Sequence, residues 1–155
     1  MRLCVQSHSK TNFGVQEMLK GNTLSFTKTE AESYLRALIS VARSNGFVHD
    51  KEKEFIDIQA QLVSIESARH WENEENDLSF LRNVNMSRMN RMAIIRDCIA
   101  LGYIDGNFDN KQRANIAKVA GYLKLADSDI EDIETWLKEL WAVLEKGRKL
   151  FEGNG

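Results

Sequence analysis

The stretch SNGFVHDKE, residues 44–52, is matched sixty positions later by IDGNFDNKQ, residues 104–112. Each stretch follows an apolar run with helical spacing and begins another, and each carries a glycine, Gly46 or Gly106, beside a polar or acidic residue. Glycine ends helices readily because it adopts the left-handed backbone conformation without steric cost. The repeat therefore predicts two helix-loop-helix units within one small domain.

The alignment of residues 34–65 with residues 94–125 extends the repeat beyond the two loops. Six positions are identical: Arg36/Arg96, Ile39/Ile99, Gly46/Gly106, Lys51/Lys111, Ile56/Ile116 and Ala60/Ala120. Apolar residues at three- and four-residue intervals in both halves indicate amphipathic helices. We expect an all-α fold, a compact bundle of about seven helices in which two pseudo-symmetric helix-loop-helix repeats pack face to face.

The composition suits one cytoplasmic domain. A chain of 155 residues with a hydrophobic share of 43% can form a core, and the absence of proline suits long helices. Two distant cysteines argue for a reducing compartment and against a disulfide framework. A net charge of −2 gives no reason to expect binding to nucleic acid. We expect no transmembrane segment, because no stretch is apolar enough to span a bilayer.

Capping patterns place the domain at residues 27–152, after an N-terminal extension at residues 1–26. Thr27 with Glu30, and Ser128 with Glu131, have the spacing of a capping box, and Ser87 can cap a further helix. The helices that we expect cover residues 13–20, 27–45, 49–69, 78–84, 87–105, 110–124 and 129–152. A polar connection over residues 70–78 carries Trp71, which either packs in the core or forms an exposed anchor for a partner.

A calcium-binding loop is the first interpretation of the repeated stretches. Such a loop needs glycine at position six and a bidentate glutamate at position twelve, which Gly46 and Glu52 supply. Positions one and three, however, are Val41 and Arg43, neither of which is a carboxylate. This pattern argues strongly against a calcium loop.

Helix capping is the second interpretation, and we favour it over an ion site. Glu52 lies three residues after His49, and Gln112 lies three residues after Asp109, which is the spacing of a capping box. Glutamine caps a helix as well as glutamate does but is a poor metal ligand. The amide at position 112 therefore fits capping better than metal binding.

The doubled pattern is a polar or acidic residue, glycine, any residue, an apolar residue, three residues, then glutamate or glutamine. It resembles the TerB-like family associated with tellurite resistance, over about residues 29–144. The resemblance implies a bundle of about seven helices, a role in metal-stress response, and acidic loop residues that bind a cation. Here these positions are Asn45, Glu52, Asp105 and Gln112, and two of them are amides where the family usually has carboxylates.

The other residue constellations indicate no reaction. Glu66 and His70, four residues apart, suit a solvated helix face with an ion pair better than a metal clip. We expect a solvated face also from a run of basic residues, with an acidic partner or a phosphate as the less favoured ligand. The run comprises Arg82, Arg88, Arg91 and Arg96. No zinc-binding His-Glu-x-x-His motif, phosphate-binding glycine loop or nucleophile elbow occurs, so we expect no enzyme activity.

We therefore expect a non-enzymatic interaction or sensing module of a bacterial stress system of the tellurite-resistance kind, with a protein partner and no nucleic acid. The alternative is a weak divalent-cation-binding protein whose ligands are Asn45, Glu52, Asp105 and Asp109. No other cofactor is expected. A shared cation requires the two loops to lie close together. The repeats should pack face to face, because each hairpin alone would leave an apolar face in water, and this packing allows the loops to lie near one another or at opposite ends. We expect that they lie near one another, because the resemblance implies a cation held by these acidic loop residues.

Overall fold

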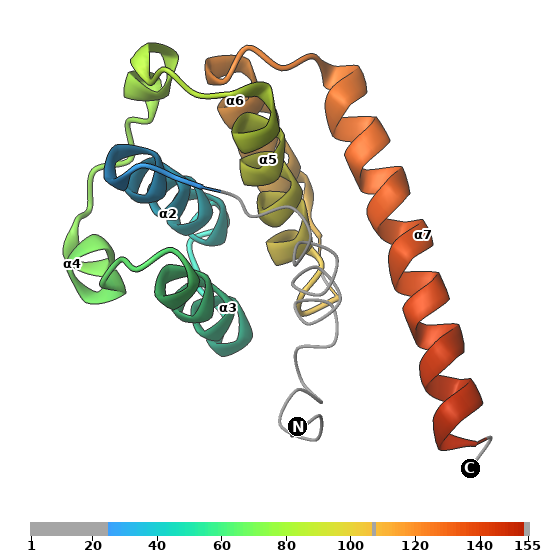
Figure 1. Ribbon diagram of the computed structural model, residues 1–155. Coiled ribbons are helices and arrows are strands. Elements are labelled where there is room, and N and C mark those ends of the chain that lie inside the picture. The colour runs from blue at the N-terminus through green and yellow to red at the C-terminus, as the bar shows by residue number, and fades with distance from the viewer. Residues whose placement is uncertain (1–24, 107, 154–155) are drawn as a thin grey trace.

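The computed structural model describes residues 25–106 and 108–153, and these residues form helices without any strand (Figure 1). The elements are α2 (Lys28–Ala42), α3 (Asp50–Leu62), α4 (Ser67–Glu72), the 3₁₀ helix η2 (Ser79–Asn83), α5 (Arg88–Gly102), α6 (Asn110–Tyr122) and α7 (Asp127–Glu152). The expectation of an all-α protein is confirmed. The helix expected over residues 13–20 lies outside the described residues, so the count of about seven helices stays a prediction.

The helices α2 and α5 form the centre of the bundle (Figure 1). The helix α2 packs against α3, α4, α5 and α6, while α5 also contacts α6 and α7. Leu35, Leu38 and Val41 of α2 and Ile95 and Ile99 of α5 have no exposed surface, so the burial of these side chains drives the association of the two helices. In the described part of the chain, no helix has both the length and the apolar character needed to cross a bilayer.

The N-termini of α2 and α5 begin where their capping residues predict. The Thr27 hydroxyl accepts from the Glu30 amide, and Glu30 Oε1 accepts from the Thr27 amide, each at 3.2 Å. The Ser87 hydroxyl accepts from the Asn90 amide at 3.1 Å. Glu30 Oε2 also accepts from Asn90 Nδ2 at 2.7 Å in the buried interior. Each cap satisfies backbone donors that the first helical turn leaves unpaired.

The expected single helix over residues 49–69 is wrong, because the chain turns between α3 and α4. Ser64 has a φ angle of +60°, and the Ile65 amide donates to the Ala60 carbonyl at 2.9 Å. The Ser64 amide donates to the Gln61 carbonyl at 3.1 Å. These two bonds are those of the Schellman motif, which closes the C-terminus of a helix. The sequence did not indicate this helix end, because glycine usually occupies the left-handed position and this chain has serine there.

The capping box expected from Ser128 and Glu131 is also wrong, because α7 begins at Asp127. The Asp129 carboxylate accepts from the Ala126 amide at 2.8 Å, so the group that reaches back to the helix start lies two residues earlier than predicted. An aspartate in the first turn satisfies this free amide and also interacts favourably with the helix dipole. The dipole makes the acidic start of α7 a stabilising feature.

Trp71 packs against the core from α4, as the first of its two interpretations predicts. Its indole N–H donates to Asp57 Oδ1 at 2.9 Å, which joins α4 to α3. Glu66 precedes α4, whereas His70 is buried, and burial lowers the pKa of its imidazole. His70 therefore does not lie on a solvated helix face, and that expectation is wrong.

Candidate functional site

The two repeated loops lie beside each other. Asn45 Nδ2 donates to Asp109 Oδ2 at 3.0 Å, and Gln112 Nε2 donates to Glu52 Oε2 at 3.0 Å. The negative charge of Asp105 acts on Glu52 and contributes to raising its pKa. The structure therefore pairs Asn45 with Asp109 and Glu52 with Gln112 across the two loops, and Asp105 lies within electrostatic reach of Glu52, as the expected proximity of the loops requires.

The contact between Glu52 and Gln112 is buried, with each residue 1% exposed. Glu52 Oε1 accepts from the His49 amide at 3.0 Å, so Glu52 caps α3 with one oxygen and holds Gln112 with the other. Burial is the main cause that raises the pKa of Glu52. The amide at position 112 is suited to this site because it donates a hydrogen bond to the buried carboxylate, where a glutamate would repel it.

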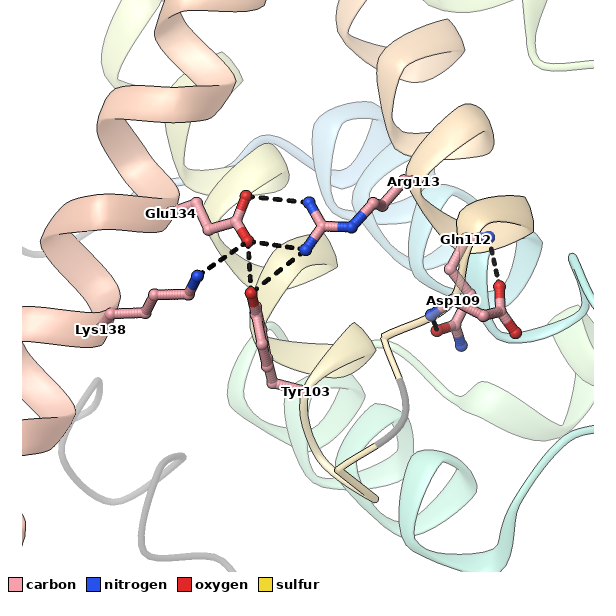
Figure 2. Close-up of polar contacts among 6 residues, drawn as sticks. All are labelled: Tyr103, Asp109, Gln112, Arg113, Glu134 and Lys138. Carbon is pink, nitrogen blue, oxygen red and sulfur yellow. Dashed lines mark hydrogen bonds and ion pairs between the residues drawn. The ribbon is translucent and has the colours of Figure 1, made fainter.

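The capping box of α6 positions Gln112 for this contact (Figure 2). The Gln112 amide donates to Asp109 Oδ1 at 2.8 Å, and Gln112 Oε1 accepts from the Asp109 amide at 3.4 Å. The bond from the Gln112 amide, followed by that from Asn45, lowers the pKa of Asp109. The capping interpretation of the spacing is confirmed, and tertiary packing adds the bond to Glu52.

The carboxylate oxygens of Glu52 and Asp109 already have N–H partners. Both oxygens of Glu52 and both oxygens of Asp109 accept hydrogen bonds from amide groups. Across residues 25–106 and 108–153, no group of three or more His, Cys, Asp or Glu side chains is placed to hold a metal ion. A hard cation would need several of these oxygens and would have to displace their donors. As arranged, the residues form a hydrogen-bonded link between the loops, and cation binding stays a prediction.

A second polar cluster joins the loop between α5 and α6 to α7 (Figure 2). Arg113 donates to both oxygens of Glu134, at 3.1 and 2.9 Å, and the Tyr103 hydroxyl also donates to Glu134. Lys138 Nζ lies 3.5 Å from Glu134 Oε1. These bonds, with that from Arg113 first, lower the pKa of Glu134. The cluster is a network that fixes α7 against α6 and the second loop.

The basic run Arg82, Arg88, Arg91 and Arg96 does not form one solvated face, and that expectation is wrong. Arg96 is buried and pairs with both oxygens of Asp97, at 2.8 and 3.0 Å. Arg88 pairs with Asp129 at 2.7 Å, and Arg91 donates to the Leu123 carbonyl at 3.0 Å. Tertiary packing thus disperses these charges among separate contacts.

A groove with a volume of about 750 Å³ lies between α2, α6 and the connection that follows α4. Its lining residues are Ser40, Arg43, Ser44, Glu74, Asn76, Lys111, Ala114, Asn115 and Lys118. Three of them are cationic and one is anionic, a net lining charge of +2 in a chain whose net charge is −2. Sequence reasoning missed this groove because its lining comes from three separate segments with no shared motif.

Two contacts shape the groove. Arg43 donates to the carbonyl oxygens of Trp71 and Asn73, the latter at 2.7 Å, and so holds the segment after α4 as one wall. Asn115 Nδ2 donates to the hydroxyl oxygens of Ser40 and Ser44, at 2.9 and 3.2 Å, and so ties α6 to α2. The exposed side chains of Lys111 and Lys118 project from α6. Their seven-residue separation is two helical turns, about 10.5 Å along one helix face.

Comparison with protein-family models, with curated proteins and with solved structures found no match to this chain. The resemblance to the TerB-like family therefore rests on the doubled loop pattern and its spacing.

Proposed function

We propose that this chain is a non-enzymatic interaction module of a TerB-like bacterial stress system, and that it binds an acidic segment of a partner protein in the groove between α2 and α6. One observation carries the proposal. Arg43, Lys111 and Lys118 gather on the groove, opposed only by Glu74 among its lining residues, in a chain that is negative overall. A local positive surface on such a protein selects acidic partners through complementary potentials.

The spacing of the two lysines suits an extended acidic segment. Lys111 and Lys118 stand about 10.5 Å apart on one face of α6. An extended chain advances about 3.3 Å per residue and alternates its side chains between two faces, so carboxylates four residues apart lie on one face about 13 Å apart, a separation that two flexible lysine side chains can span. Asn115 and the two serine hydroxyls beside it give the groove a polar lining, and the hydrogen bonds among them keep α6 in place beside α2.

The chemistry of the interior supports a binding role. Cys98, the cysteine within the described residues, is buried, and burial raises the pKa of its thiol, which removes it as a nucleophile. The carboxylates of Glu52 and Asp109 are engaged in holding the loops together. Surface recognition therefore explains the polar residues of this molecule better than acid–base chemistry does.

We further infer the pseudo-symmetric repeat from bonds that join residues sixty positions apart. Glu30 accepts from Asn90, and Glu52 accepts from Gln112, both in the interior. Gly46 and Gly106 have φ angles of +82° and +83°. Pairs of this kind are expected where two similar hairpins meet about an approximate twofold axis. They join α2 to α5 and α3 to α6, while the bonds from Asn115 to Ser40 and Ser44 hold α6 beside α2 and so maintain the groove.

The experiment is a fluorescence anisotropy titration of the full chain with a labelled octaglutamate peptide. We expect binding that weakens with salt, because exposed charges are screened. The double variant Lys111→Glu/Lys118→Glu should lose at least about tenfold in affinity, or about 1.4 kcal/mol. Glu74→Gln should bind more tightly than the wild type, because it removes the acidic residue of the lining.

The control variant Lys28→Glu/Lys51→Glu makes the same change in net charge at two exposed positions outside the groove lining and should keep most of the affinity. Equal losses in the two double variants would show that only net charge matters and would overturn the proposal. If an oligothymidylate binds more tightly than the peptide, with the same dependence on Lys111 and Lys118, the ligand of the groove is nucleic acid and not an acidic protein segment.

The alternative function is weak binding of a divalent cation at the paired loops. The observation that favours it is the closeness of the loops, where the charge of Asp105 acts on the buried carboxylate of Glu52. Calorimetric titration with calcium, magnesium, zinc and manganese tests it directly. Heat of binding that is lost in Glu52→Gln and in Asp105→Asn would establish the cation site, whereas equal heats in these variants and the wild type would refute it.

A further inference from the structure

An apolar strip is exposed along α7. Val143 is 67% exposed, Leu150 is 77% exposed and Phe151 is 89% exposed, and Trp136 and Leu144 are also exposed. By contrast, Ile133 and Leu137, nearer the start of the helix, are buried in the core. Figure 1 shows the C-terminal half of α7 extending past the ends of the other labelled helices. The strip therefore occupies a part of α7 that the bundle leaves uncovered.

The five residues of the strip lie on one face of the helix. Trp136, Val143 and Leu150 are spaced by seven residues, and so are Leu144 and Phe151, which follow the last two directly. A seven-residue apolar repeat is the pattern of a helix that packs against a second helix. From Trp136 to Phe151 the strip spans sixteen residues, and the fifteen steps between its ends cover about 22 Å. A contiguous apolar surface of this length on a soluble protein marks an interaction site.

The charges of α7 indicate what covers the strip. Residues 127–139 contain six acidic residues and one basic residue, whereas residues 140–152 contain three basic residues and two acidic residues. The first half is therefore strongly negative, and the second half is slightly positive. In the second half, Arg148 is paired with Glu145 and Glu152 of its own helix, which leaves Lys146 and Lys149 as the basic groups directed outward.

This asymmetry selects a second copy of the same helix in antiparallel orientation. An antiparallel copy places the negative half of each α7 against the positive half of the other, whereas a parallel copy would place the two negative halves together. Glu139 and Lys146 are seven residues apart on the helix flank beside the strip. In the antiparallel arrangement, Glu139 of each copy would lie opposite Lys146 of the other copy. An isologous contact of this kind is closed and contains the same surface from both chains.

We propose that the chain forms an antiparallel homodimer through this strip, with Val143 at the twofold axis and Trp136 of each copy against Leu150 of the other. The dimer leaves the groove between α2 and α6 open, because no residue of α7 lines that groove. Two grooves in one dimer would bind two segments of a partner at once and gain avidity. The dimer itself does not depend on the proposed function of the groove.

Sedimentation velocity of the full chain over a range of concentrations tests the proposal. We expect a mass of two chains for the wild type, and a mass of one chain for Val143→Arg, which places two like charges at the twofold axis. Val143 is exposed, so the helical spectrum and the melting temperature of the isolated subunit should be retained. The control Ala142→Arg adds the same charge at an exposed position on another face of α7 and should remain dimeric.

A charge exchange tests the antiparallel orientation. Glu139→Lys should weaken the dimer, and the double variant Glu139→Lys/Lys146→Glu should restore it, because the opposite charges then face each other again. A monomer at all concentrations would overturn the proposal. A dimer that Val143→Arg does not dissociate, or one that the charge exchange fails to restore, would also overturn it.

Discussion

Replacing Gln112 with glutamate tests the buried contact that joins the two repeats. Gln112 Nε2 donates to Glu52 Oε2 at 3.0 Å, and both residues are 1% exposed. The variant removes the donor and places a second carboxylate in its position, while the capping of α6 is kept because glutamate also accepts from the Asp109 amide. The change therefore isolates the contact across the repeats from the local contact within α6.

The size of the expected loss in unfolding free energy follows from the distance between the two side chains and from their burial. Loss of a hydrogen bond to a charged acceptor costs about 1.5–3 kcal/mol. Two carboxylates at about 3 Å repel by about 5 kcal/mol at an effective dielectric constant of 20. The pair avoids this repulsion by retaining one proton, and holding a carboxyl group protonated at pH 7, against an ordinary pKa of about 4.3, costs about 3.7 kcal/mol. We therefore expect Gln112→Glu to lose between 2 and 4 kcal/mol at pH 7 (approximate limits from these three terms).

The loss of stability in Gln112→Glu should grow as pH rises. In the variant, the folded state binds one proton more tightly than the unfolded state does, so the pKa of the pair is raised by folding. The loss of stability is then absent below the ordinary carboxyl pKa and grows as pH rises toward neutrality. Urea unfolding at pH 5 and pH 7 measures it, and the loss at pH 5 should be only about 1 kcal/mol.

The exchange variant Glu52→Gln/Gln112→Glu is the matched control. It keeps one carboxylate and one amide in the contact and should recover most of the stability that Gln112→Glu loses. An unfolding midpoint of Gln112→Glu equal to that of the wild type at pH 7 would refute the reasoning. So would an exchange variant as unstable as the single variant.

Three further changes have expected outcomes. Gly106→Val should lose about 1–2 kcal/mol in urea unfolding, because Gly106 has a φ angle of +83° and a Cβ there would meet no atom within 4 Å, which leaves backbone strain as the cost. Its control, Gly121→Ala within α6, should gain up to about 1 kcal/mol; equal midpoints would contradict both. Asp109→Ala should lose about 0.5–2 kcal/mol of unfolding free energy at pH 7. Folding lowers the pKa of Asp109, so this difference should shrink as acid protonates the wild-type cap below the ordinary carboxyl pKa. In a Cys4→Ser background, Cys98 should react with a thiol reagent only as fast as the protein unfolds, because it is buried with a raised thiol pKa; rapid reaction of the folded protein would show that the site opens.

Much of the local structure could be predicted from the sequence. The caps at Thr27, Ser87 and Asp109 act on amides three residues ahead, so the residues that make each contact lie within one helical turn. The left-handed turns at Gly46 and Gly106 depend on the conformational freedom of glycine itself. The apolar spacing likewise determines the buried faces of α2 and α5, because a helix places residues three and four apart on one side.

The tertiary structure decided where several helices end and which side chains meet. The turn at Ser64, whose left-handed conformation is more often found at glycine, is closed by backbone bonds to Gln61 and Ala60 that do not depend on the side chain at position 64, so the residue type does not indicate it. The sequence identified Glu52 and Gln112 as capping residues, but their bond to each other joins positions sixty apart. Short-range contacts are determined by the residue types at a fixed spacing. Contacts such as this one, and the groove that brings Lys111 and Lys118 beside Arg43, exist only once the helices have packed.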